Sequence, residues 1–139
     1  MAVSHTLCIA AICLRDADGR LLLVRKRGTQ ALILPGGKLE AGESAQAALL
    51  RELDEELGLH LPLNALQPLG RFRAPAANEP DTWVDAQVFH ARLEPMTEVA
   101  PAAELDALHW LVVDAPLPAE TAPLLRDQVL PALGFYSHY

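Results

Sequence analysis

The chain has 139 residues, of which 51% are hydrophobic, so one domain with a substantial core is expected and a wholly disordered chain is excluded. Its formal net charge of −7 argues against a surface that binds a nucleic-acid duplex, because such a surface neutralises phosphates with lysine and arginine. No apolar run approaches the length of a membrane span, and the N-terminus lacks the regions of a signal peptide. We therefore expect a single domain over residues 1–139 that is cytoplasmic and binds no membrane.

The N-terminal part of the chain predicts two strands joined by a turn. Residues 6–14 form a continuous apolar run that is short enough for a buried strand. The sequence Asp-Ala-Asp-Gly at 16–19 has turn chemistry, and residues 20–24 return as a second strand. Cys8 and Cys13 are too few for a disulfide framework and point to opposite faces of the first strand. We interpret both as buried thiols in a reducing compartment.

The densest basic cluster of this acidic chain, Arg25-Lys26-Arg27, follows the second strand. It is either a charged strand end or a source of cations for substrate phosphate and for nearby acids. Arg25 and Arg27 are our candidate substrate-binding residues. Residues 31–34 then predict a short strand that leads into a tight turn at Pro35-Gly36-Gly37, where the missing Cβ atoms let the backbone approach a ligand closely.

A helix is predicted from Ser44, a good N-cap residue, to Gly58, a good C-terminal stop. The residues between them are mostly strong helix formers, with no proline and no β-branched residue. Helical spacing places three leucines on one face and three glutamates on another. The leucines are Leu50, Leu53 and Leu57, and the glutamates are Glu52, Glu55 and Glu56.

Three carboxylates in one patch need a counter-charge. Like charges three or four residues apart destabilise a helix by a few tenths of a kcal/mol per pair, and Arg51 alone lies close enough along the helix to offset them. Mg²⁺ or Mn²⁺ would reverse this repulsion, because such hard cations bind carboxylate oxygens. A Glu-x-x-Glu-Glu pattern by itself is more often a solvated helix face, so the metal hypothesis depends on the residues around it.

The stretch from Gly37 to Leu59 resembles the Nudix box of the Nudix hydrolase family at every defined position. Five residues separate Gly37 from Glu43, and seven more precede Arg51-Glu52-Leu53. Glu55-Glu56 and Gly58-Leu59 follow, each after a gap of one residue. A pattern of this many fixed positions favours the metal hypothesis over the solvated face.

The resemblance implies a role for each matching residue. Family members bind Mg²⁺ or Mn²⁺ through positions that correspond here to Gly37, Glu52, Glu55 and Glu56. Arg51 corresponds to the arginine that holds the glutamates in place and is counted among the candidate catalytic residues. Glu43 corresponds to a mainly structural acid near the start of the helix. Glu55 is also a candidate for the general base.

Residues 66–74 and 82–93 predict two further strands, joined by an exposed loop at 75–81. In the first of them Phe72 stands between two arginines. An aromatic residue at such a position belongs more often to the core, but it would stack on a nucleobase if its strand faced the cleft. Phe72 is therefore our third candidate for substrate binding.

The C-terminal part predicts an acidic loop at 96–105, a strand at 108–113 and a last helix that is N-capped by Thr121. The segment 104–110 resembles a region of the family in which an acid precedes a strand and acts as catalytic base or extra metal ligand. Glu104 is the candidate here, with Glu98 behind it. An exposed loop glutamate without a catalytic role is the equal alternative.

Strands flanked by two helices predict an α/β fold, a Nudix-type α/β/α sandwich around a mixed β-sheet. The resemblance implies a Mg²⁺- or Mn²⁺-dependent pyrophosphohydrolase. Its substrate would be a nucleoside diphosphate linked to another group, either an ADP-ribose-like sugar nucleotide or a damaged nucleoside triphosphate. The alternative is a non-catalytic Nudix-fold module that binds or senses a nucleotide, which the intact box disfavours. The partner is then a small-molecule nucleotide, and the sequence leaves open the substrate, the general base, the number of metal ions and whether the chain forms a homodimer.

Overall fold

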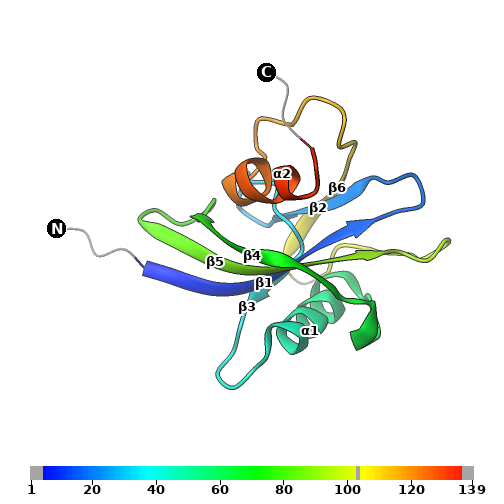
Figure 1. Ribbon diagram of the computed structural model, residues 1–139, viewed down its shortest axis with the longest axis horizontal. Helices are drawn as coiled ribbons and strands as arrows, with labels where there is room; N and C mark the ends of the chain where they lie inside the picture. The colour runs from blue at the N-terminus through cyan, green and yellow to red at the C-terminus, as the bar shows by residue number, and fades with distance from the viewer. Residues whose placement is uncertain (1–4, 103, 136–139) are drawn as a thin grey trace.

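The computed structural model in Figure 1 describes residues 5–102 and 104–135. A six-stranded mixed sheet has one helix against one face and the C-terminal helical segment against the other. The predicted fold class, an α/β/α sandwich around a mixed sheet, is confirmed.

The strands are β1 (His5–Arg15), β2 (Leu21–Lys26), β3 (Gly36–Lys38), β4 (Gln67–Pro75), β5 (Thr82–Arg92) and β6 (Leu105–Leu111). The helical segments are α1 (Ala45–Leu57), the 3-10 turn η1 (Leu63–Ala65), the π-helical η2 (Leu124–Val129) and α2 (Leu130–Ala132). The order across the sheet is β4-β5-β1-β2-β6, and β3 pairs with β1. Over the described residues, no helix has both the length and the apolar character needed to cross a membrane.

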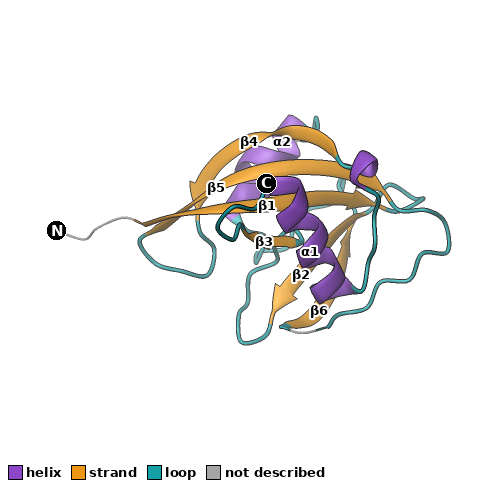
Figure 2. Cartoon of the chain, turned by 90° about the horizontal axis from the view of Figure 1, so that it is seen from below, coloured by secondary structure: helices purple, strands orange, loops and turns teal. Residues whose placement is uncertain are grey.

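Strand β1 organises the sheet. It runs parallel to β5 along its whole length, from the pair His5–Thr82 to the pair Arg15–Arg92. Strand β1 pairs antiparallel with β2 at Arg15 and Leu21. Strand β3 pairs with β1 at residues 9–11. The glycine segment is therefore a strand paired with the middle of β1, not a free turn (Figure 2).

Two predictions for this region are wrong. The tight turn expected at 35–37 is largely strand β3, and the strand expected at 31–34 consists of two isolated bridges. One bridge joins Ile33 to Val24 and the other joins Leu32 to Thr121. Neighbouring residues thus pair with different segments, and Pro35 has no N–H for a ladder bond, so no continuous strand forms.

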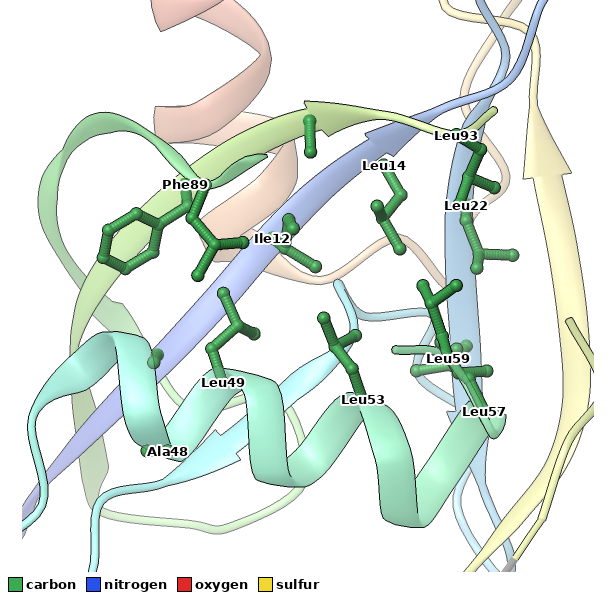
Figure 3. Close-up of a cluster of buried hydrophobic side chains, with 14 of the residues drawn as sticks. Ile12, Leu14, Leu22, Ala48, Leu49, Leu53, Leu57, Leu59, Phe89 and Leu93 are labelled. Carbon is green, nitrogen blue, oxygen red and sulfur yellow. The ribbon is translucent and has the colours of Figure 1, made fainter. Parts of the chain in front are cut away.

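A separate core lies on each face of the sheet. On the α1 face, Ile12 and Leu14 pack above Leu49 and Leu53 (Figure 3). The α1 residues that are buried are Ala45, Ala48, Leu49, Leu53, Glu56 and Leu57. Leu49 replaces Leu50 on the apolar side, since Leu50 is only half-buried. The core on the opposite face includes Cys13, Leu21, Leu23, Leu125 and Val129.

The two cysteines lie in different environments. Cys13 is buried in the core opposite α1, and burial raises the pKa of its thiol to about 12. Cys8 is exposed, so the prediction that both thiols are buried is wrong for this residue. The N-terminal end of β1 extends past the helix, which leaves that end of the sheet uncovered (Figure 2).

Both predicted ends of α1 are confirmed. The Ser44 hydroxyl oxygen accepts a hydrogen bond of 3.1 Å from the Ala47 amide, and Gly58 closes the helix with a φ of 62°. The amide of Gly58 donates to the Asp54 carbonyl, which satisfies a group that the helix end leaves without a partner. These local bonds fix the start and the end of the segment that carries the glutamates.

The C-terminal predictions need two corrections. Strand β6 begins at Leu105 rather than 108, because its pairing with β2 continues past a bulge to the pair Lys26–Leu105. Thr121 does not cap a helix, since its hydroxyl donates to the Pro118 carbonyl at 2.7 Å and its backbone bridges Leu32. Pro123 is the residue that precedes the helical segment.

Candidate active site

The carboxylate of Glu52 lies directly against the backbone of Gly37. A Cβ atom built on Gly37 would stand 2.5 Å from Cδ and 2.6 Å from Oε1 of Glu52, closer than real Cβ contacts. Only a residue without a side chain lets the carboxylate occupy this position. The contact brings a carboxylate and a backbone segment together, and both supply the oxygen ligands that Mg²⁺ and Mn²⁺ take in proteins.

Glu56 lies one helical turn beyond Glu52 and is only 6% exposed. Burial, followed by the charge of Glu52, raises the pKa of the Glu56 carboxyl to about 8, while the charge of Lys26 acts in the opposite direction. Among the described residues, no cationic group lies within 4.0 Å of this carboxylate. A buried acid beside a second acid fits a site completed by a cation, so the residues present fit a divalent metal.

Arg51 fixes the orientation of Glu52. Its guanidinium donates to Glu43 at 2.8 and 3.0 Å and to Glu52 Oε1 at 2.9 Å. It also donates to the Lys38 carbonyl at 3.2 Å, which ties the helix to β3. The hydrogen bonds from Arg51 lower the pKa of Glu43 to about 2, so Glu43 is ionised at neutral pH. The geometry matches an arginine that holds one of the glutamates in place.

Glu55 stands apart from Glu52 and Glu56. Its side chain is 55% exposed and lies 3.6 Å from Arg51. Across the described part of the chain, no group of three or more His, Cys, Asp or Glu residues is close enough to hold a metal ion. The structure therefore brings Glu52 and Glu56 together but not all three glutamates, and Glu55 as a ligand stays a prediction.

Glu104 approaches the same site from the loop before β6. Its charge contributes to the raised pKa of Glu56, and its backbone carbonyl accepts a hydrogen bond of 2.6 Å from the Arg27 amide. The loop is thereby fastened to the end of β2. Glu98 is exposed in the same loop, and no described contact brings it to the box.

Two of the three candidate substrate residues lie elsewhere. Arg25 donates to Asp106 at 2.9 Å and lines a cavity of about 420 Å³ that contains none of the box residues. Arg27 is exposed, and Phe72 packs against the core on the face opposite α1. The structure does not bring Arg25 or Phe72 to the glutamates.

Lys26 is the basic residue that the sequence did not single out. It acts electrostatically on Glu56 and lines a cleft of about 130 Å³ together with Gly36 and Gly37. The pairing of β2 with β6 shifts between Arg25 and Lys26, so strand alternation from the sequence could not assign its direction. The only indication of Lys26 in the sequence was its place in the basic cluster Arg25-Lys26-Arg27.

The cleft has an apolar floor and a polar rim. Its floor includes Leu7, Ile9, Leu34 and Val84, and its rim carries Asn78 and Glu79. The lining also includes Gly37, which contacts the carboxylate of Glu52, and Lys26, whose charge acts on Glu56. None of the box glutamates lines the cleft, so Gly37 and Lys26 are the residues that connect it to the carboxylates.

The arrangement has a counterpart among known proteins. The model of the NUDIX domain matches residues 5–133. The chain belongs to the NUDIX family. The predicted family is thus confirmed.

Two relatives show how the NUDIX chain compares with curated proteins. It is 38% identical over 129 residues to an octanoyltransferase of Myxococcus xanthus, a match that covers 90% of this chain and 35% of that protein. It is 41% identical over 61 residues to an 8-oxo-dGTP diphosphatase of Haemophilus influenzae, covering 41% of this chain and 44% of that protein. The chain therefore matches less than half the length of each of these relatives.

A solved structure confirms the NUDIX fold. The MutT NUDIX hydrolase from Burkholderia pseudomallei superposes with a TM-score of 0.72 at 25% identity, covering 95% of this chain and 98% of that one. Members of the family are pyrophosphohydrolases, which is the enzyme class predicted from the box.

Proposed function

We propose that this chain is a divalent-metal-dependent hydrolase that cleaves the diphosphate linkage of a small nucleotide. The observation that carries the proposal is the packing of the Glu52 carboxylate beside buried Glu56 and on Gly37, a residue that also lines the cleft. The alternative is a module that binds a nucleotide without cleaving it. Such a module does not need a buried acid beside a second acid, so this observation does not support the alternative.

Each residue of the site has a proposed part in the reaction. Glu52, Glu56 and the carbonyl of Gly37 hold Mg²⁺ or Mn²⁺, which when bound neutralises diphosphate charge and makes a water molecule more acidic. Arg51 keeps Glu52 turned toward Gly37 through its bonds to Glu43 and Glu52. Lys26 contacts a phosphate group of the substrate, and Glu55 or Glu104 removes the proton from the attacking water.

The cleft supports a nucleobase as the group at the far end of the substrate. About 130 Å³ lined by aliphatic side chains suits one flat ring system, and the amide of Asn78 on the rim offers a paired donor and acceptor for a base edge. A relative named as an 8-oxo-dGTP diphosphatase favours a damaged nucleoside triphosphate over an ADP-ribose-like sugar nucleotide. We propose the triphosphate as the first substrate to test.

The direct test is a product assay on a panel of nucleotides with Mg²⁺, with Mn²⁺ and with a chelator. An oxidised nucleoside triphosphate is expected to give a nucleoside monophosphate and pyrophosphate only when metal is present. Cleavage of sugar nucleotides alone would reassign the substrate while leaving the reaction class intact. Nucleotide binding without any turnover in the presence of metal would favour the binding module.

Metal is expected to stabilise the fold. Because the paired carboxylates of Glu52 and Glu56 exist only in the folded chain, a cation bound there should raise the midpoint of a thermal melt as its concentration rises. The Glu56→Gln variant should show a smaller gain. Glu94→Gln, at an exposed loop position, is the matched control and should respond like the wild type. An equal gain in all three proteins would contradict a site at Glu56.

The two glycines are expected to respond differently to alanine. At Gly36 a Cβ atom would collide with the backbone carbonyl of Ala10, so Gly36→Ala should lower the free energy of unfolding by about 1–3 kcal/mol or more. At Gly37 the nearest atoms all belong to the flexible Glu52 side chain, so Gly37→Ala should fold but bind metal weakly. Thermal melts with and without Mn²⁺ measure both effects. A Gly37→Ala protein with unchanged metal response would show that the glycine does not shape the site.

A further inference from the structure

A second cavity, with no lining residue in common with the cleft, lies at the C-terminal ends of β1 and β5. Its volume is about 450 Å³, and the residues that line it are Arg15, Ala65, Gln67, His90, Ala91, Arg92 and Leu133. Arg15 and Arg92 are paired in the parallel register of β1 and β5, and Gln67 and His90 are paired between β4 and β5. Strand alternation places these four side chains on one face of the sheet.

The positive charge in this cavity is not neutralised by the described part of the protein. Neither Arg15 nor Arg92 has a carboxylate oxygen within 4.0 Å among the described residues. Arg20, Arg51 and Arg71 each form an ion pair with an aspartate or a glutamate, whereas Arg27 and Arg73 form none among the described residues. Arg15 and Arg92 are distinguished by lining one cavity together.

Two like charges on directly paired strand positions destabilise a sheet unless an anion lies between them. Phosphate fits two neighbouring guanidinium groups especially well, since each guanidinium can donate two parallel N–H bonds to its oxygens. Arg15 and Arg92 thus bring to one cavity the charge and the kind of N–H donors that phosphate sites use.

Arg15 is also held in place. Its guanidinium carbon lies 5.4 Å from the centroid of the Phe135 ring. Stacking on a ring uses the flat face of the guanidinium and leaves the N–H groups at its edge free to donate. Gln67 is restrained in a similar way, because its side-chain amide donates to the Asn64 carbonyl at 3.3 Å. Donors that are already oriented lose less conformational entropy when an anion binds.

We propose that Arg15 and Arg92 bind the phosphate group of a small molecule at a site separate from the catalytic cleft, with His90 and Gln67 at its sides. The ligand is either inorganic phosphate or a phosphorylated metabolite such as a nucleoside monophosphate. The cavity has room for the larger of these, since its volume exceeds that of a phosphate group. Both share the chemistry that the two guanidinium groups recognise.

The test is an NMR titration of the ¹⁵N-labelled, metal-free protein at constant ionic strength. Inorganic phosphate should shift the backbone amides of residues 15 and 90–92 in a saturable manner, whereas acetate should not. A nucleoside monophosphate that binds more tightly at the same amides would identify a nucleotide ligand, and equal affinity would identify phosphate alone. Both of these results support the proposal.

The variants decide whether the two arginines are responsible. Arg92→Gln should weaken phosphate binding at least tenfold, and it should fold normally because the described residues make no hydrogen bond or ion pair to the Arg92 side chain. Arg15→Gln should have the same effect, with a thermal melt to confirm folding. Arg71→Gln changes the net charge equally on the other face of the sheet and should bind like the wild type. Equal binding by Arg92→Gln and wild type, shifts confined to the catalytic cleft, or equal shifts with acetate would overturn the proposal.

Discussion

Glu56→Gln is expected to lower kcat by about a thousandfold or more, because it removes one of the two paired carboxylates proposed to hold the metal. The loss should appear with Mg²⁺ and with Mn²⁺ at saturating substrate. Glu94→Gln is again the control, since it removes the same charge from an exposed loop. A Glu56→Gln enzyme with kcat within tenfold of the wild type would place the metal elsewhere.

The same variant should not lose stability in the absence of metal. In the fold the pKa of Glu56 rises from 4.5 to about 8, so its ionised form is disfavoured there. The stabilising effect of this shift is complete below pH 4.5 and is lost as the pH rises through about 8. Glutamine stays neutral throughout. Metal-free Glu56→Gln should therefore melt at or above the wild-type midpoint at pH 9, and a strongly lowered midpoint would attribute any loss of activity to misfolding.

Loss of the general base should have the second largest effect. Removing it is expected to lower kcat by roughly a hundred- to ten-thousandfold and to flatten the acidic limb of the pH–rate profile. We expect this result for one of Glu55→Gln and Glu104→Gln, not for both. Both side chains are exposed, and we favour Glu104 because its charge acts on Glu56, whereas Glu55 lies 3.6 Å from Arg51.

The pH profile separates the base from a residue that only supports the loop. A structural role for Glu104 would lower kcat at every pH and leave the shape of the profile unchanged. If both variants keep the activity and the profile of the wild type, neither residue is the base. The metal site formed by Glu52 and Glu56 would be unaffected by that outcome.

Local chemistry made the helix and its ends predictable from the sequence. Ser44 and Gly58 act through bonds to residues three or four positions away, so their effect can be read without knowledge of the fold. The same holds for the spacing of Glu52 and Glu56, which one helical turn brings together. The opposite directions of Cys8 and Cys13 likewise follow from strand alternation.

Features that depend on distant partners could not be predicted in this way. Strand β3 forms because Gly36–Lys38 pairs with β1, and the sequence of the glycine segment alone indicates only a turn. Lys26 reaches the cleft next to a shift in the pairing of β2 with β6, which no residue pattern within β2 reveals. The separation of Glu55 from Glu52 and Glu56 depends on which side of α1 packs on the sheet, where Glu56 is buried and Glu55 is exposed.

The parallel pairing of β1 with β5 determines when the site can be assembled during synthesis. The register joins His5 to Thr82 and Arg15 to Arg92, so β1 has no complete partner until the ribosome has made all of β5. Gly37 and the glutamates of α1 are synthesised earlier, yet β1 is the strand that positions Gly37 against Glu52. Closing so long a loop is slow compared with forming a helix. Until it closes, the edge of β1 that will pair with β5 lacks this partner, and an unpaired strand edge is a site where a nascent chain can associate with other chains or with chaperones.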